Sequence, residues 1–214
     1  MTLDLDTARQ WYSQTDTVHG FDHILRVYKL AERIAQAEGA DLEIVRAAVL
    51  LHDSKGATVE QSTENRKEHH IASAEFAEEV LRADGWSSER IAAVQHAIRA
   101  HRFRHNGERP ETLEAQCLFD ADKLDVLGAI GAARTIAYST QAGQPVWSQP
   151  SEQFLSTGEK MPGEPHSAYH EYLFKLRKIK DQLFTPTGRH LAIDRTQFLA
   201  QFFDQLTAEV SGER

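Results

Sequence analysis

Apolar residues recur every three or four positions along most of the chain, which is the spacing of amphipathic helices. The segment DHILRVYKLAERIAQAEGA shows this pattern from Asp22 onward, and it meets a helix stop signal at Gly39. The same spacing predicts six further helices, over about 41–53, 68–83, 87–101, 113–138, 167–183 and 188–208. No stretch of the sequence alternates as a strand does, so we predict an all-α helical bundle of about seven or more helices.

Two polar stretches interrupt the helical pattern. Residues 55–67 are irregular, and residues 139–166 carry four of the six prolines. We expect the second stretch to be a long loop, because proline cannot continue a helix. A chain of 214 residues suffices for one domain with a substantial core. We expect one domain over 1–214, with its core in about 19–138 and the helices of 167–208 packed on it.

The composition narrows the classes of function. A net charge of −8 argues against a nucleic-acid polymer as partner, because proteins that bind one carry basic surfaces. No apolar run approaches the roughly 20 residues of a membrane span, and MTLDLDTARQ lacks the pattern of a secretory signal. The one cysteine, Cys117, suits a reducing compartment. We therefore expect a cytoplasmic protein, monomer or homodimer, with a small-molecule substrate and no membrane partner.

Side chains that can bind metal stand on otherwise apolar helix faces. His23 lies four residues before Val27, on the inward stripe of its helix. His52 and Asp122 continue the inward stripes of two other helices, and Asp53 follows His52 directly. Each of these alone could be a hydrogen-bonded core residue. Burying all four separately would be costly, whereas one divalent cation would remove that cost, and imidazole with carboxylate suits Mn²⁺, Fe²⁺ or Zn²⁺.

Three segments carry a family resemblance, in the order HGFDHILRVYKLA, AAVLLHDSKG and FDADKLDVLGAIGAAR. Together they strongly resemble the HD-domain metal-dependent phosphohydrolases, whose all-helical fold holds a His…His-Asp…Asp metal site. The chain is most similar to a subgroup of small bacterial nucleotide-hydrolase-like HD proteins, over about residues 19–205. Carried over by position, the resemblance assigns metal ligation to His23, His52, Asp53 and Asp122, the residues that the helix faces also indicate.

The resemblance implies a metal-dependent hydrolase of nucleotide-like phosphate esters or anhydrides. Release of pyrophosphate from nucleoside triphosphates is the reaction we expect, with monophosphate hydrolysis as a close variant. We expect one divalent ion, Mn²⁺ before Mg²⁺, Fe²⁺, Zn²⁺ or Ni²⁺, to lower the pKa of a bound water. The alternative is a metal- and nucleotide-binding sensor of the same fold without turnover, although the presence of all four ligands weighs against it.

Further residues are candidates for catalysis beside Asp53, and these are Arg26, His96 and Lys123. Arg26 and Lys123 each lie close in sequence to an expected ligand, so either could take up phosphate charge. Arg26 could instead be a surface residue, and Lys123 could flank the ion or pair with Asp120. His96 could act as an acid–base partner or as a phosphate ligand.

A second metal ion is the main alternative at the site. His70, His96 and His101 could provide its ligands, although nothing in their spacing demands it. His96 and His101 are five residues apart and point in directions that differ by about 140°, unless the helix ends between them. Lys55, which follows the His-Asp doublet, could either reach a phosphate or lie in solvent.

Overall fold

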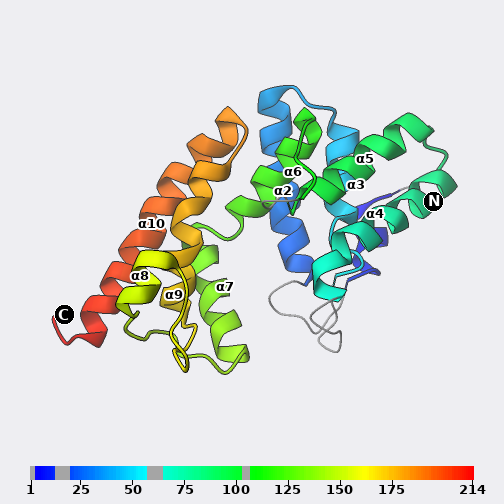
Figure 1. The fold of residues 1–214 in the computed structure, drawn as a ribbon. Coiled ribbons are helices and arrows are strands. Elements are labelled where there is room, and N and C mark those ends of the chain that lie inside the picture. Colours follow the sequence, from blue (N-terminus) through cyan, green and yellow to red (C-terminus); the bar gives the residue numbers. More distant parts are fainter. Residues whose placement is uncertain (1–2, 13–19, 57–64, 103–106) are drawn as a thin grey trace. The chain divides into compact units, whose positions relative to one another are not determined.

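The structure is a computed structural model, and it describes residues 3–12, 20–56, 65–102 and 107–214. All regular elements in these residues are helices, which confirms the all-α prediction (Figure 1). The chain forms two compact units. The first comprises residues 1–122 and 183–188, and the second comprises 123–182 and 189–214. The expectation of one domain over the whole chain stays a prediction.

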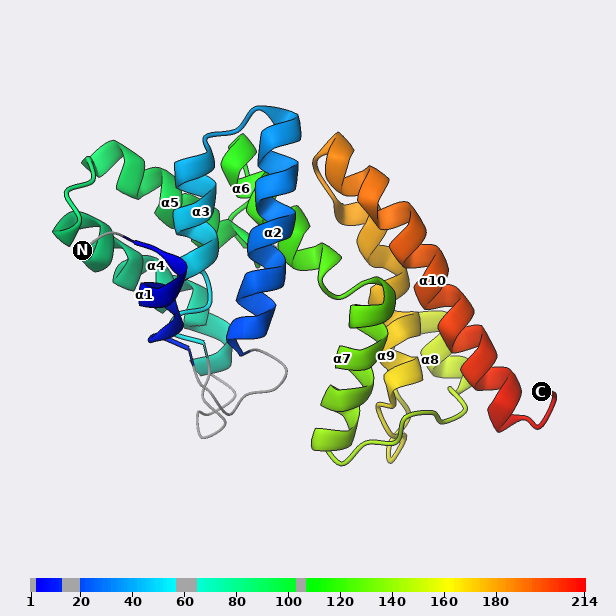
Figure 2. The same cartoon turned by 180° about the vertical axis from the view of Figure 1, so that it is seen from behind.

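The first unit surrounds a central buried helix. It contains α1 (Leu5–Arg9), α2 (Phe21–Glu38), α3 (Leu42–Leu51), α4 (Asn65–Ala83), α5 (Ser88–Ala100) and most of α6 (Leu113–Leu124). α3 packs against α1, α2, α4 and α5, and its place among them can be followed in Figure 2. Because α3 is covered on several sides, residues 47–51 are all apolar and buried. This apolar run leads directly to His52, the C-cap of the helix.

The boundaries of these helices follow signals in the sequence. Gly39 ends α2, as predicted. Ser87 caps α5 by accepting a hydrogen bond from the amide of Arg90. α5 ends at Ala100, so His101 lies at its C-cap rather than within the helix. The end of α5 therefore falls between His96 and His101.

The second unit is held together largely by aromatic side chains. It contains α7 (Gly128–Gln141), α8 (Glu152–Thr157), α9 (Ala168–Phe174), the 3₁₀ helix η1 (Leu176–Gln182) and most of α10 (Pro186–Val210). The rings of Tyr172 and Phe203 stack with their centroids 4.5 Å apart and join α9 to α10. Trp147 stacks on Tyr169 and donates a hydrogen bond to Thr207. None of the described helices in either unit is both long and apolar enough to cross a membrane.

The long helix predicted over 113–138 is instead two helices, α6 and α7. Gly128 has a φ of 69°, in the left-handed region that favours glycine, and it begins α7 after a turn at residues 125–127. Asp125 in this turn is buried and forms an ion pair with Arg134 of α7. The apolar spacing continues across the turn, which is why the pattern alone predicts one helix.

Two other predictions are corrected in detail. The long loop expected at 139–166 contains α8, whose Phe154 is buried. The helix expected over 167–183 breaks after Phe174 into α9 and η1. Of the irregular stretch predicted at 55–67, residues 57–64 lie outside the described residues.

Candidate metal centre

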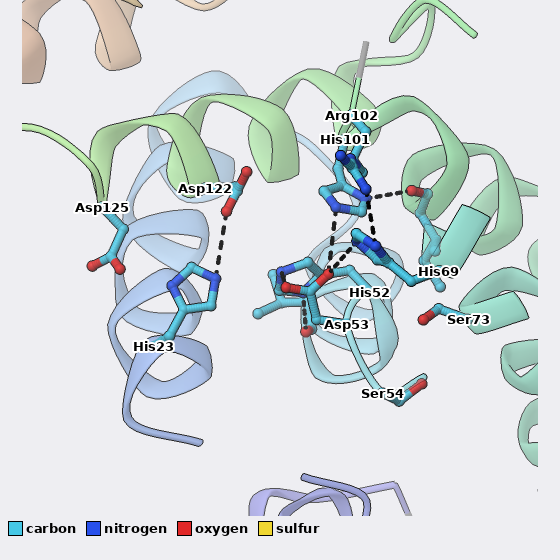
Figure 3. Close-up of polar contacts among 12 residues, drawn as sticks. His23, His52, Asp53, Ser54, His69, Ser73, His101, Arg102, Asp122 and Asp125 are labelled. Atoms are coloured by element: carbon cyan, nitrogen blue, oxygen red, sulfur yellow. Dashed lines mark hydrogen bonds and ion pairs between the residues drawn. The ribbon is translucent and has the colours of Figure 1, made fainter. Parts of the chain in front are cut away.

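Imidazole and carboxylate side chains from five helices gather beyond the end of α3 (Figure 3). The residues are His23 from α2, His52 and Asp53 at the end of α3, His69 from α4, His101 at the end of α5 and Asp122 from α6. Except for His69, each of them lies on an apolar helix face or at a helix end, and therefore points toward the interior. The cluster is therefore a direct product of the helix packing in the first unit.

The structure brings together the four residues that the sequence predicts as metal ligands. Nε2 of His23 lies 3.4 Å from Oδ1 of Asp122, and Nε2 of His52 lies 3.6 Å from Oδ2 of Asp53. One ligand atom each from His23, His52 and Asp53 lies within 4.8 Å of the others. These three residues could hold a metal ion, and Asp122 stands beside His23 as a fourth donor.

A second group shares Asp53 with the first. Nε2 of His69 lies 3.2 Å from Oδ1 of Asp53, and Nε2 of His101 lies 3.5 Å from the same oxygen. Asp53, His69 and His101 also place one ligand atom each within 4.8 Å of one another. Asp53 could therefore belong to either of two metal-binding groups.

Backbone hydrogen bonds orient two of the imidazole rings. Nδ1 of His52 lies 2.8 Å from the carbonyl oxygen of Val49, and Nδ1 of His101 lies 2.5 Å from that of Ile98. A carbonyl oxygen can only accept, so each Nδ1 donates its proton. Nε2 of each neutral ring then carries a lone pair, and both lone pairs face the carboxylate of Asp53.

This arrangement fits a bound cation. Nε2 of His52 is buried and has no hydrogen-bond partner among the described residues. A buried polar atom left unpaired costs about 1–3 kcal/mol, and a lone pair directed at a carboxylate adds repulsion. A divalent ion between them would satisfy both groups, and the donor set of imidazoles and carboxylates is one that such ions prefer.

The pKa values around Asp53 reflect burial and mutual interaction. Burial lowers the pKa of His52 to about 4, against the opposing effect of Asp53, so its imidazole is neutral at pH 7. Burial alone would raise the pKa of Asp53, but at the low pH where this carboxyl titrates the positive charge of protonated His52, with the contacts of His101 and His69, outweighs burial and holds that pKa well below its usual range. A neutral imidazole beside an ionised carboxylate is the protonation state in which both can bind a metal.

Arg26 and Lys123 lie beside predicted ligands along their helices. Arg26 is partly buried and follows His23 by three residues on α2. Lys123 directly follows Asp122 on α6. Asp120, the other partner that the sequence suggested for Lys123, is buried and accepts hydrogen bonds from the backbone amides of Phe184 and Thr185.

His96 lies apart from the groups around Asp53. Its Nδ1 is 2.5 Å from Oε1 of Glu108, and its Nε2 accepts a hydrogen bond from the amide of Glu111. Glu108 also binds the guanidinium of Arg99. In the described part of the chain, the contacts of His96 are thus with residues around 108–111. His101 joins the cluster because α5 ends before it.

His69, rather than His70, faces Asp53. Adjacent residues of a helix point about 100° apart, so α4 presents only one of the two to the site. Burial lowers the pKa of His70 to about 4, and its buried Nδ1 has no hydrogen-bond partner among the described residues. The signal for His69 was present in the sequence, since it precedes the buried Ser73 by one helical turn, but His70 precedes the buried Ala74 in the same way.

Lys55 packs against α4. Its amide donates a hydrogen bond to Oγ of Ser73, and its ammonium lies 3.8 Å from the centroid of the Phe76 ring. A cation over an aromatic face is held there by the charge distribution of the ring. Of the two roles open from the sequence, contact with a phosphate and exposure to solvent, the second agrees better with this exposed side chain and its contact with Phe76.

Comparison with known proteins places the chain in a family. A model of the HD domain matches residues 20–127, half of the chain. The Bacillus subtilis protein YpgQ is 30% identical over 214 residues, covering 97% of this chain and 94% of YpgQ. The chain belongs to the HD domain family.

Solved structures agree with this assignment over nearly the whole length. The crystal structure of Bacillus subtilis YpgQ in complex with ADP has a TM-score of 0.72 at 29% identity, covering 98% of this chain and 99% of that one. A Lactobacillus plantarum protein has a TM-score of 0.73 at 29% identity, covering 97% and 95%. An HD-superfamily hydrolase from Bacillus thuringiensis has a TM-score of 0.70 at 26% identity, covering 97% and 94%.

Proposed function

We propose that this protein is a metal-dependent phosphohydrolase of nucleotides, which cleaves nucleoside triphosphates into nucleoside monophosphate and pyrophosphate. Membership of the HD domain family and similarity to an HD-superfamily hydrolase support hydrolysis. The ADP bound to YpgQ supports a small nucleotide as the ligand class. The acidic net charge of −8 also suits a small substrate better than a nucleic-acid polymer.

The observation that carries the proposal is the orientation of His52. Its Nδ1 is occupied by the carbonyl of Val49, so the unpartnered Nε2 is directed at Asp53. We assign metal ligation to His52 and Asp53, together with His23 and Asp122. When bound there, a divalent ion would lower the pKa of water and offset phosphate charge; we expect Mn²⁺, with Mg²⁺ as the first alternative.

The residues of the chain position the reactants. In the overall reaction, the oxygen of water forms a bond to the α-phosphorus, and the bond to the bridging oxygen breaks with its electron pair leaving on pyrophosphate. The substrate brings several negative charges, and Arg26 and Lys123 stay our candidates for binding them. His96 stays a candidate acid–base group, in which role it would have to leave Glu108. For each of the three, a variant that keeps metal content and lowers kcat would support the role.

The experiment uses metal-depleted protein and a panel of nucleoside mono-, di- and triphosphates, with Mn²⁺, Mg²⁺ or no metal. Chromatography separates phosphate from pyrophosphate. We expect metal-dependent pyrophosphate release from triphosphates, and its loss together with bound metal in Asp53→Asn. The control is Asp204→Asn, an exposed carboxylate on α10. Retention of hydrolysis by Asp53→Asn without metal would disprove the assignment.

The non-catalytic sensor makes a different prediction in the same assay. A sensor would bind both metal and nucleotide, as measured by calorimetry, but release no product with any of the ions. HD domains that have lost activity usually lack one of the metal ligands, so the presence of all four predicted ligands in this chain favours the enzyme.

A further inference from the structure

Arg102 contacts His69, and this contact makes His69 differ from the other histidines of the cluster. Its Nη1 lies 2.9 Å from Nδ1 of His69 (Figure 3). A guanidinium can only donate hydrogen bonds, so Nδ1 of His69 must accept. The proton of the neutral ring is then on Nε2, which lies 3.2 Å from Oδ1 of Asp53. The nitrogen of His69 that lies nearest to this carboxylate therefore carries a proton and not a lone pair.

The other rings that face Asp53 carry their proton on the opposite nitrogen. Nδ1 of His52 and Nδ1 of His101 donate to backbone carbonyls, which leaves their Nε2 lone pairs for a metal ion. The tautomer of a ligand histidine is set by the partner of its second nitrogen. For His52 and His101 that partner is an acceptor and favours ligation, whereas for His69 it is a donor and opposes ligation.

We propose that Arg102 restricts the cluster to one divalent ion by holding His69 in the tautomer that cannot bind metal. The inference rests on the proposed function and specifies how many ions its site takes. To ligate a second ion with Asp53 and His101, His69 would have to move its proton to Nδ1. That N–H would then face the N–H groups of Arg102. The guanidinium also places positive charge beside the second group, which repels a further cation.

The two oxygens of the Asp53 carboxylate face different groups. Oδ2 lies nearest to Nε2 of His52, whereas Oδ1 lies nearest to Nε2 of His69 and of His101 and has no hydrogen-bond partner among the described residues. In the wild type we expect Oδ2 to bind the single ion, together with His52 and His23.

The test measures metal stoichiometry with Mn²⁺, without reference to activity. Metal-depleted protein is saturated with Mn²⁺, freed of excess ion and analysed for Mn²⁺ per chain and by electron paramagnetic resonance. Arg102→Met keeps much of the side-chain length but removes the donor and the charge. Arg82→Met, an exposed arginine of α4 that pairs with Glu78, is the matched control.

We expect one Mn²⁺ per chain with a mononuclear spectrum in the wild type and in Arg82→Met. Arg102→Met should bind two, with the spectrum of a spin-coupled pair, and the double variant Arg102→Met/His69→Leu should return to one. Two tightly bound ions in the wild type, or one in a folded Arg102→Met, would overturn the inference and leave the proposed function standing. A wild type that binds no divalent ion would overturn the proposed function, and this inference with it.

Discussion

His52 donates its Nδ1 proton to the carbonyl oxygen of Val49, three residues earlier in the chain, over 2.8 Å. This bond turns the ring so that Nε2 points away from the helix and toward Asp53. The carbonyl belongs to the last turn of α3, where a helix leaves carbonyls without intrahelical partners. This one hydrogen bond thus gives a carbonyl at the end of the helix its partner and aligns the lone pair of the His52 imidazole.

We predict that metal binding stabilises the folded protein and that this effect depends on His52. An ion that binds only the folded state at about 100 times its dissociation constant adds about 2.7 kcal/mol to the free energy of unfolding. Thermal unfolding with and without Mn²⁺ should show this rise in the wild type and in His190→Leu, an exposed histidine of α10. His52→Leu should lose it. An equal rise in His52→Leu would show that the ion binds elsewhere.

The four predicted ligands could be identified from the sequence because of the apolar helix faces. His23, His52 and Asp122 each continue an apolar stripe with helical spacing, and such a stripe must face a core. Their meeting at one point required only that three helices pack together. The same reasoning could not separate His69 from His70, since the residues one turn later, Ser73 and Ala74, are both buried.

Features that depend on single backbone angles or on distant contacts could not be predicted in this way. The turn between α6 and α7 depends on the left-handed φ of Gly128, while the apolar spacing runs on unchanged. The contact of Arg102 with His69 joins residues 33 positions apart, and no local pattern encodes it. His101 entered the site because α5 ends one residue before it, a boundary that spacing locates only to within a few residues.

The buried hydrogen bonds to the carboxylate of Asp120 should contribute strongly to the stability of the folded protein. Its carboxylate accepts hydrogen bonds from the amide of Phe184 and from both the amide and the hydroxyl of Thr185, over 2.6–2.9 Å. The Thr185 hydroxyl also accepts a hydrogen bond from the amide of Gly188. A Cβ at position 188 would lie 2.3 Å from Oδ2 of Asp120, so the close approach requires glycine. These hydrogen bonds therefore hold residues 184–188 against α6 in the first unit.

We predict that Thr185→Val lowers the free energy of unfolding by about 1.5–3 kcal/mol, the usual value of a hydrogen bond to a charged group. Thr185→Ser keeps the hydroxyl and should lose less. Urea unfolding followed by circular dichroism measures both variants. A Thr185→Val midpoint equal to that of the wild type would mean that the hydroxyl contributes nothing to Asp120.

The thiol of Cys117 should be inert in the native protein. Cys117 is fully buried in α6, and burial, with the nearby carboxylates of Asp120 and Glu114, raises its pKa to about 12. The reactive thiolate is then scarce at pH 8, and reagents reach the sulfur only after local opening. We expect no rapid reaction with a disulfide reagent at pH 8, and one thiol per chain after unfolding in urea. Ser211→Cys, at an exposed position, should label at once under native conditions.

Glu164 should make the stability of the second unit sensitive to acid. Its carboxylate accepts hydrogen bonds from the amide and hydroxyl of Ser151 and from the amide of Met161, and it lies 3.1 Å from Nε2 of His170. These bonds, that of the Ser151 amide foremost, lower the pKa of Glu164 from 4.5 to about 2. A carboxyl whose pKa is lower in the folded state stabilises fully above its unfolded pKa, and the contribution fades as the pH falls toward the folded pKa.

We therefore predict that Glu164→Gln is less stable than the wild type at pH 7 and that the difference shrinks between about pH 4.5 and pH 2. The amide of glutamine offers only one acceptor oxygen, so it cannot accept all these hydrogen bonds, and it carries no charge to lose. Urea midpoints at pH 7, 5, 4 and 3 measure the difference, with Glu213→Gln at the exposed C-terminus as control. A difference that stays constant over this range would show that the ionised carboxylate is not what the folded state stabilises.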